Sequence, residues 1–408
     1  MRWGKIALVT LALATTACAA TPAPAPERPR PTLTPLRLSQ SPLWTYQGAR
    51  NVELRAGLVL FNHGDQRLLL ADAAFGTPRW EFAKGHELRD GAHYQESFVP
   101  GPGVRHLVGS GERLGVLVEH ETGVARVSAQ DGSVVWQTSV LEAGVEQNQV
   151  LNLRAVDDRV VLVSVTEEPP NRPGFAGVPV RTVALDVGTG TRVWESFDGV
   201  WPSLIAGDMV LGQETRGLPG QTATGGLPDG TVVGIDLLSG ARRWDLTNRF
   251  TRSSLVLAAG DVAVVTGVTA VTPDRRETVI VSVDTGEEIA SVPAAAVTCR
   301  SDRRALVACV SDDDPRYALY TYTSGDRAVR TAARGAAHGV RLAAVLAGRI
   351  VLGLTSNGDA IRWRTLDAFG NTLDTTLDPP GPVRAITDDY AVFNTGPAGE
   401  IGVYRISR

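Results

Sequence analysis

The chain has 408 residues, of which 43% are hydrophobic and 21% charged, and this balance excludes wholesale disorder and a protein with many membrane spans. Its 40 basic and 44 acidic residues give a net charge of −4, so nucleic acid is disfavoured as a partner. The 43 glycines and two methionines favour a fold with many tight turns and few helices.

The start of the chain has the features of an export signal. Two basic residues precede an uncharged apolar run over residues 6–14, and small residues then lead into Cys18. This order predicts a secretory signal peptide over residues 1–17, whose apolar run is too short to remain as a membrane span. The junction resembles the bacterial lipobox, with Thr15 where that motif favours Leu, which implies cleavage before Cys18 and its acylation. The alternative is cleavage nearby and release as a soluble exported protein.

A proline-rich segment follows the signal. Seven of the 24 prolines lie between residues 19 and 43, with no apolar periodicity. Because proline restricts φ and lacks a backbone donor, we expect a semi-stiff extended spacer. The sequence therefore predicts a signal peptide over residues 1–17, a lipid-anchored tether over 18–42 and one folded domain over 43–408. We expect an exported protein held by its lipid at the outer face of the cell membrane.

The rest of the chain contains a repeat. In four copies a glycine is followed four places later by a tryptophan, and three weaker copies keep the glycine but not the tryptophan. The repeat glycines are Gly76, Gly132, Gly190, Gly240, Gly286, Gly325 and Gly370, and the tryptophans are Trp80, Trp136, Trp194 and Trp244. The average spacing from the first glycine to the last is 49 residues, which indicates a solenoid, propeller or array.

Each repeat is expected to be a four-stranded β-sheet. Val-rich runs such as residues 159–165 and 278–283 are too short for core helices. The repeat glycine follows the third strand and is expected to take a positive φ in the turn, where a Cβ would clash. The tryptophan then lies on the outermost strand, where it can wedge against the neighbouring sheet.

The number of sheets follows from the third strands. Eight candidates are present, the last at residues 402–406, but only seven repeat turns follow them. The segment 43–46, which contains Trp44, matches the outer strand and has no turn before it. Pairing this segment beside residues 403–407 would close the ring and remove an open edge. We therefore predict an all-β, eight-bladed propeller closed by an N-terminal strand.

The pattern [Ala/Leu]-x-Asp-x-x-[Ser/Thr]-Gly-x-x-x-Trp resembles that of the quinoprotein-type (PQQ-like) β-propellers. One branch of that family contains dehydrogenases that bind pyrroloquinoline quinone, and another contains non-catalytic lipoproteins, such as the propeller subunit of the outer-membrane β-barrel assembly machinery. The dehydrogenases typically carry two adjacent cysteines under the cofactor, whereas Cys18, Cys299 and Cys309 are dispersed, and Cys-x-x-Cys-His is absent. We therefore carry over no catalytic, cofactor-binding or metal-binding residue, and expect the non-catalytic branch.

Other reactive patterns are weak. The six histidines lack the spacing of a metal site, and Gly-x-Ser-x-Gly does not occur. Cys299 and Cys309 flank a polar turn between two strands, and antiparallel pairing would place them opposite one another. In an oxidising compartment they are expected to form a disulfide; the alternative is two buried thiols.

A partner surface is expected where long loops gather. Residues 83–103, 167–180 and 212–229 connect strands on the same face of consecutive blades. The first loop carries a mixed polar set, His86, Arg89, His93 and Tyr94. The alternative is neutral variation in loop length.

Three hypotheses for function remain. The first is a monomeric interaction scaffold that binds an exported or membrane protein through this face. The second is a module that binds a small ligand or carbohydrate in the central funnel. The third is a quinone-dependent oxidoreductase with a divergent site.

Overall fold

The computed structural model describes residue 33 and residues 37–63, 67–95, 105–141, 149–167, 179–215, 230–272, 275–295, 297–302, 304–313, 316–336, 339–346, 348–355, 362–374, 380–396 and 399–407. Contacts within the chain divide it into two units, Met1–Leu33 and Thr34–Arg408. The predicted signal peptide, Cys18 and most of the predicted tether lie outside the described residues. Within the ranges given above, no helix has the length and apolar character needed to cross a membrane.

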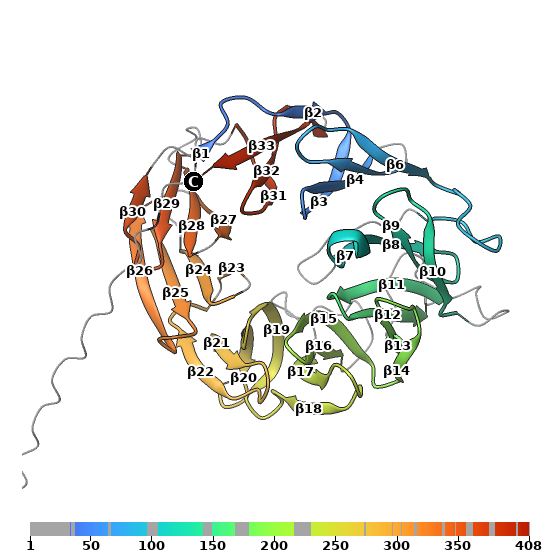
Figure 1. Cartoon of the computed structure of the whole chain (residues 1–408). Helices are drawn as coiled ribbons and strands as arrows, with labels where there is room; N and C mark the ends of the chain where they lie inside the picture. The colour runs from blue at the N-terminus through green and yellow to red at the C-terminus, as the bar shows by residue number, and fades with distance from the viewer. Residues whose placement is uncertain are drawn as a thin grey trace, which may run out of the picture. The chain divides into compact units, whose positions relative to one another are not determined.

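In the second unit, antiparallel strands form eight sheets that follow one another around a central axis (Figure 1). The first strand of each sheet lies nearest the axis. These sheets are the blades of an eight-bladed propeller, as the repeat predicts. The chain leaves no long amphipathic helical pattern to compete with the strands, because its apolar runs are short and rich in β-branched residues.

Blades 1 to 4 contain all four complete repeats. Their strands are, in blade 1, β3 (Ala49–Arg55), β4 (Leu58–His63), β5 (Arg67–Asp72) and β6 (Pro78–Ala83); in blade 2, β7 (Leu107–Val108), β8 (Gly115–His120), β9 (Gly123–Ser128) and β10 (Val134–Ser139); in blade 3, β11 (Gln149–Val156), β12 (Val160–Glu167), β13 (Pro179–Asp186) and β14 (Arg192–Ser196); and in blade 4, β15 (Val200–Ala206), β16 (Met209–Thr215), β17 (Gly230–Asp236) and β18 (Arg242–Asp245). A short 3-10 helix, η1 (Gly111–Arg113), joins β7 to β8.

Blades 5 to 8 complete the ring. Their strands are, in blade 5, β19 (Phe250–Ala259), β20 (Val262–Thr269), β21 (Arg276–Ser282) and β22 (Glu288–Val292); in blade 6, β23 (Thr298–Ser301), β24 (Leu306–Asp313), β25 (Arg316–Thr323) and β26 (Ala328–Ala336); in blade 7, β27 (Gly339–Leu346), β28 (Arg349–Thr355), β29 (Arg362–Asp367) and β30 (Thr372–Asp374); and in blade 8, β31 (Val383–Ile386), β32 (Tyr390–Asn394) and β33 (Ile401–Ser407), with β1 (Arg37–Leu38) and β2 (Trp44–Tyr46) outside β33.

The two ends of the blades differ. The first-to-second and third-to-fourth turns lie together at one end, where Ala73 N–H donates to Gly57 O (2.8 Å) and Val187 N–H to Arg159 O (2.8 Å). The second-to-third connections and the links between blades lie at the other end. We call the first end the turn face and the second the loop face.

The hydrophobic core is divided among the junctions between blades. Each of the eight buried clusters combines side chains from two neighbouring blades, such as Leu60 and Trp80 of blade 1 with Val116 and Val127 of blade 2. A blade therefore hides both of its faces only when the ring is complete, so closure contributes to the stability of every blade.

Blade 8 confirms the predicted closure. Trp44 pairs with Val403 in antiparallel register, so the N-terminal segment supplies the outer strand that the C-terminal sheet lacks. The pairing also extends further toward the N-terminus than expected, because Arg37 lies opposite Ser407. Part of the predicted tether is thus a strand of the ring.

The repeat tryptophans join successive blades. Each indole N–H donates to a backbone oxygen at the repeat turn of the next blade, at 2.7–3.0 Å; the pairs are Trp44 to Ala73, Trp80 to Ser128, Trp136 to Val187, Trp194 to Leu237 and Trp244 to Val283. A donor at the end of a large apolar ring thus combines burial with a fixed register between sheets.

The contact between each indole ring and the next repeat turn requires glycine in that turn. Gly76 has a φ of 69°, and a Cβ there would lie 2.7 Å from Cγ of Trp44. Gly240 has the same relationship to Trp194, at 2.8 Å from Cδ2. Both the left-handed conformation and the close ring therefore exclude other residues.

Blade 6 corrects the assignment of Gly325 to this set. Gly325 does not have a left-handed φ, and the repeat position is taken by Arg327, which has a φ of 50° and donates its N–H to Thr323 O at 3.1 Å. In the preceding blade, Ala290 stands where the complete repeats have tryptophan. No indole ring therefore covers this turn, and a residue with a Cβ is tolerated.

The predicted disulfide is present. Cys299 and Cys309 are directly opposite in β23 and β24, with their Cα atoms 4.1 Å apart and both side chains buried. It joins the inner two strands of blade 6, in the part of the ring that lacks repeat tryptophans.

Candidate functional site

The segment between blades 1 and 2 forms a small hairpin over residues 84–95, which we call the junction hairpin. His86 and Tyr94 pair through Tyr94 N–H to His86 O (2.9 Å), and Leu88 N–H donates to Ala92 O (2.8 Å). Asp90 and Gly91 have positive φ values of 54° and 76° at its tip. The Asp-Gly sequence suits such a tight turn, because Asp tolerates the left-handed region and Gly has no Cβ to clash.

Aromatic packing fixes the base of the hairpin to blade 1. The His86 ring stacks on Phe82 with centroids 4.3 Å apart, and Phe82 stacks on Trp80 at 4.6 Å. Tyr94 lies in the same buried cluster, 6.3 Å from Phe82. The hairpin is therefore held by the repeat tryptophan of its own blade.

The other side of the hairpin is bound to blade 2. The Arg89 guanidinium donates to Val134 O (2.7 Å), and the Gln137 amide donates back to Arg89 O (3.2 Å). His93 N–H donates to the Glu121 carboxylate at 2.9 Å. These contacts tie the hairpin to the outer strand and to the second-to-third turn of blade 2.

The hairpin also completes the inner edge of blade 2. β7 has only two residues, whereas its partner β8 has six. Tyr94 forms a bridge with His120, and Gln95 N–H donates to Glu119 O at 3.0 Å. The inner edge of β8 is thus covered by β7 at one end and by the hairpin at the other.

A polar cleft of about 530 Å³ lies between the hairpin tip and blade 2. Its lining residues are Arg89, Asp90, Gly91, Ala92, Glu121, Thr122, Gln137 and Ser139. Burial alone would raise the pKa of Glu121, but the His93 N–H and neighbouring donors outweigh it and hold that pKa below its usual value. The cleft therefore offers a fixed negative charge beside hydroxyl and amide groups, which is suited to recognition of a polar segment.

The structure separates the four residues predicted to form a partner face. His86, Arg89 and His93 are exposed on the junction hairpin. Tyr94 is only 1% exposed, so its place on this face was wrong. Its side chain packs inward because alternate residues of the returning strand face opposite sides, and the exposed side belongs to His93.

Long loops were also predicted at residues 167–180 and 212–229. Nearly all of both segments lies outside the described residues.

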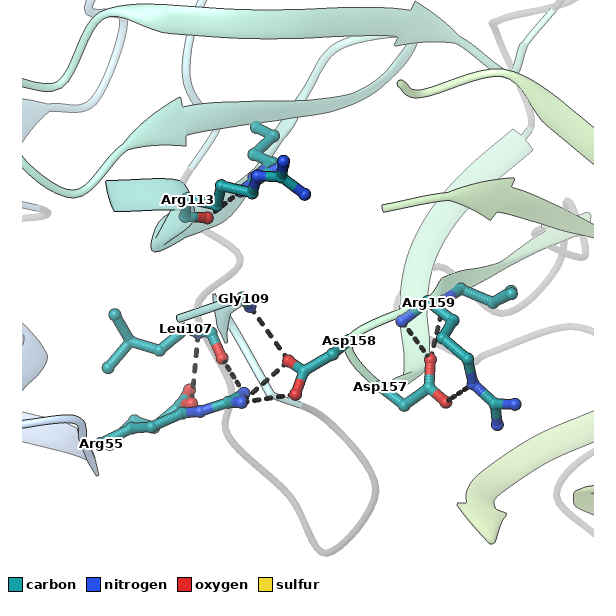
Figure 2. A network of polar contacts seen from close by, with 10 residues as sticks. Arg55, Leu107, Gly109, Arg113, Asp157, Asp158 and Arg159 are labelled. Carbon is teal, nitrogen blue, oxygen red and sulfur yellow. Dashed lines mark hydrogen bonds and ion pairs between the residues drawn. The ribbon is translucent and has the colours of Figure 1, made fainter. Parts of the chain in front are cut away.

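A second group of polar contacts lies near the axis, at the turn-face end of blades 1 to 3 (Figure 2). The Arg55 guanidinium donates to both Asp158 oxygens (2.8 and 2.7 Å) and to Leu107 O (2.7 Å), and Gly109 N–H donates to Asp158 at 3.0 Å. Arg159 continues the series to Asp208 of blade 4 at 2.6 Å. These contacts join consecutive blades where β7 is short.

The electrostatics of this network match a structural role. Desolvation would raise the pKa of Asp158, but hydrogen bonds from Arg55 and Gly109 outweigh it and lower that pKa. Burial raises the pKa of Glu53, whose carboxylate accepts the N–H groups of His106 and Leu107. This network is not visible in the sequence, because Arg55 and Asp158 are 103 residues apart and only the Asp157-Asp158-Arg159 turn has a recognisable local pattern.

Metal-binding chemistry has no cluster to support it in the described ranges, where no group of three or more His, Cys, Asp or Glu side chains converges.

Comparison with known proteins places this geometry in a family. A family model described as "Outer membrane protein assembly factor BamB" matches residues 64–363. The chain belongs to this family of PQQ-repeat propellers. The match spans most of the ring, from blade 1 into blade 7. No curated protein sequence matches the chain significantly.

Solved structures resemble this BamB-family propeller to different degrees. BamB from Moraxella catarrhalis has 16% identity, a TM-score of 0.37, and coverage of 87% of this chain and 83% of that one. The quinohemoprotein alcohol dehydrogenase from Comamonas testosteroni has 12% identity, a TM-score of 0.50, and coverage of 91% of this chain and 76% of that one. The computationally designed Ika8 protein has 12% identity, a TM-score of 0.49, and coverage of 88% and 96%. At these identities the likeness concerns the fold alone.

Proposed function

We propose that this chain is an exported, lipid-anchored and non-catalytic propeller of the cell envelope, and that its junction hairpin binds another exported or membrane protein. The observation that carries the proposal is the hairpin itself. The hairpin stands outside the four-stranded blade pattern and exposes His86, Arg89 and His93, and a polar cleft lies beside its tip. A rigid scaffold that displays a polar loop is the usual arrangement of a recognition surface.

Three further features support the proposal. The family description names an assembly factor, which is consistent with a role in binding other proteins. The expected signal peptide and Cys18 would place the chain at the membrane surface. The charged side chains of the site hold the hairpin in place, because Arg89 donates to Val134 O and Glu121 accepts the N–H of His93. This favours binding over a catalytic role.

The charges near the axis give less support to a ligand in the central funnel. Arg55 and Asp158 are directed at each other and at the backbone of blade 2. A ligand that used them would have to break contacts that join three blades.

Lysine content makes the proposal directly testable. The sequence has two lysines, Lys5 in the predicted signal peptide and Lys84, which is exposed at the start of the junction hairpin. An amine-reactive photocrosslinker can therefore be attached beside the hairpin through Lys84. Illumination in isolated membranes should give one defined protein adduct, identified by mass spectrometry.

The matched control moves the lysine to the turn face. A chain with Lys84→Arg and Arg192→Lys carries the reagent on β14, close to the repeat turn of blade 3. The adduct should be absent from this variant and weakened by Arg89→Glu in the Lys84 protein. Equal adducts from both lysine positions, or no adduct from either, would refute the proposed binding surface.

A further inference from the structure

The chain joins the ring at its turn face. β33 is the third strand of blade 8 and ends at Ser407, and third strands end at the turn face in every blade. Arg37 pairs with Ser407, so the residue that continues the N-terminal segment into the ring lies at this rim. An anchor at Cys18 would be tied to the propeller from this side.

Three repeat turns expose a large apolar side chain on the turn face. Phe75 is 79% exposed in blade 1, Leu238 is 62% exposed in blade 4, and Phe369 is 41% exposed in blade 7. Val135 and Val193, in the second positions of β10 and β14, add exposed apolar surface next to the turns of blades 2 and 3. Around the ring, Phe75, Leu238 and Phe369 are separated by three, three and two blades. They therefore surround the axis and define a plane.

Hydrogen bonds to an aspartate side chain order the turns that carry these tips. In blade 1, the Asp72 carboxylate accepts the N–H groups of Ala74 (2.8 Å) and Phe75 (3.2 Å). In blade 4, Asp236 accepts from Leu238 (3.2 Å) and Ser239 (2.9 Å). Apolar side chains held by ordered turns meet a surface without the entropy cost of ordering a loop.

In blades 1 and 4, arginine partly neutralises the acidic residue of the turn. Arg243 pairs with Asp236 at 2.6 Å, and Arg79 lies 3.7 Å from Asp72. At the blade 7 tip, the guanidinium of Arg330, from β26 of the neighbouring blade 6, lies 5.5 Å from the centre of the Phe369 ring and pairs with Asp326 at 3.2 Å. An arginine therefore accompanies each apolar tip, which lowers the repulsion between an acidic turn and an anionic lipid surface and suits the headgroup layer.

We propose that the turn face rests on the lipid bilayer, with Phe75, Leu238 and Phe369 inserted among the headgroups. This placement rests on the proposed membrane anchoring, and it directs the loop face and the junction hairpin away from the lipid toward a partner. The expected spacer over residues 18–36 would reach about 60 Å if extended, enough for either face to meet the bilayer. The surface of the ring, rather than the tether, then selects the orientation.

Two unique reactive groups allow a direct test. With the Cys299–Cys309 disulfide intact, Cys18 is the remaining thiol, because the sequence has three cysteines. The chain from Cys18 onward is coupled through this thiol to a maleimide lipid in vesicles of three parts phosphatidylethanolamine and one part phosphatidylglycerol. Lys84, on the loop face, carries a donor dye after the N-terminal amine is blocked, and the bilayer contains an acceptor lipid. A Lys84→Arg chain measures background labelling.

Energy transfer then reports the height of Lys84 above the lipid. The wild-type chain should show low transfer, because the loop face points outward. A triple variant, Phe75→Ser, Leu238→Ser and Phe369→Ser, should show at least about twice the transfer, since the ring would turn freely on its tether. When neither protein is coupled to lipid, the triple variant should partition into the same vesicles about tenfold more weakly than the wild type. The reason is that burial of large apolar side chains contributes to the free energy of membrane binding.

The matched control removes apolar side chains from the loop face. Phe197→Ser with Val271→Ser deletes two side chains that are 71% and 91% exposed, and it should leave the transfer unchanged. Equal transfer from the wild type and the triple variant, or a rise in the Phe197/Val271 variant as large as in the triple variant, would overturn the orientation. The Lys84 photocrosslink in membranes tests the partner surface separately, so the two proposals can fail independently.

Discussion

The indole N–H of Trp44 donates to the backbone oxygen of Ala73 at 2.9 Å and joins blade 8 to blade 1. The same ring lies over Gly76, whose turn belongs to blade 1. One side chain from the N-terminal segment therefore secures both the missing strand of the last blade and the junction that closes the ring.

Replacement of Trp44 should weaken the whole propeller. Trp44→Phe keeps most of the ring packing but loses the indole donor, and the free energy of unfolding should fall by about 1 kcal/mol. Trp44→Ala also removes the packing and should cost about 3 kcal/mol. Urea unfolding followed by circular dichroism measures both. A Trp44→Ala chain as stable as the wild type would contradict the role of this segment in closure.

The repeat glycines provide a matched pair of substitutions. Gly240→Ala places a Cβ 2.8 Å from Trp194 in a left-handed conformation, and we expect a loss of about 2 kcal/mol or more. Gly325→Ala meets no atom within 4 Å and has no left-handed φ, so its stability should change by less than about 0.5 kcal/mol. Thermal melts of the two variants distinguish them. Similar losses would show that the distinction between Gly325 and the other repeat glycines is incorrect.

The disulfide should stabilise the part of the ring without repeat tryptophans. Cys299 and Cys309 are ten residues apart in sequence, and closing a loop of this size restricts the unfolded chain by about 3 kcal/mol. The double variant Cys299→Ala and Cys309→Ala should lose a similar amount in urea unfolding. Reduction of the wild type should lower the unfolding midpoint toward that of the variant, while the variant itself should not respond to reductant.

Acid should destabilise the fold through His106. Burial lowers the pKa of this histidine to about 4 from an ordinary value of 6.5, against a smaller opposing hydrogen bond with Leu117 O. Between these values the unfolded chain binds a proton that the folded chain does not. Stability is therefore retained above about pH 6.5 and falls by about 3 kcal/mol as the pH drops to about 4.

The variant His106→Gln lacks the titrating imidazole. The difference in unfolding free energy between this variant and the wild type should therefore change with pH between about 4 and 6.5. Glu53, which contacts His106 N–H and has a raised pKa, is common to both proteins. The variant His93→Gln, which replaces an exposed histidine, serves as the control for the loss of an imidazole elsewhere in the chain. A constant difference between the His106 variant and the wild type would disprove this source of acid sensitivity.

Much of the ring was predictable because its information is local and repeated. A glycine, a strand turn and a tryptophan lie within five residues of one another, and the same spacing recurs from Gly76 to Trp244. The closing role of Trp44 followed from counting strands, since an incomplete sheet at one end matched an isolated strand at the other. The cysteine pair followed from the antiparallel strands on either side of a short turn.

Other features were not visible in the pattern. Arg327 takes the repeat-turn position in blade 6 because the tryptophan that would exclude a Cβ is absent from another blade. Tyr94 was assigned to the surface by its polarity, but its ring fills the space beside Phe82. The β1 pairing was hidden in a proline-rich segment whose composition favours an extended spacer.

The sequence by itself determined the strand period, the turns and the number of blades, since these depend on backbone preferences of neighbouring residues. Only the tertiary structure decided which distant groups meet: Arg55 with Asp158, the junction hairpin with blade 2, and Phe75, Leu238 and Phe369 on one rim. The physical reason is that contacts between blades depend on how whole sheets pack around the axis, and the local pattern of each repeat does not contain the shape of its neighbours.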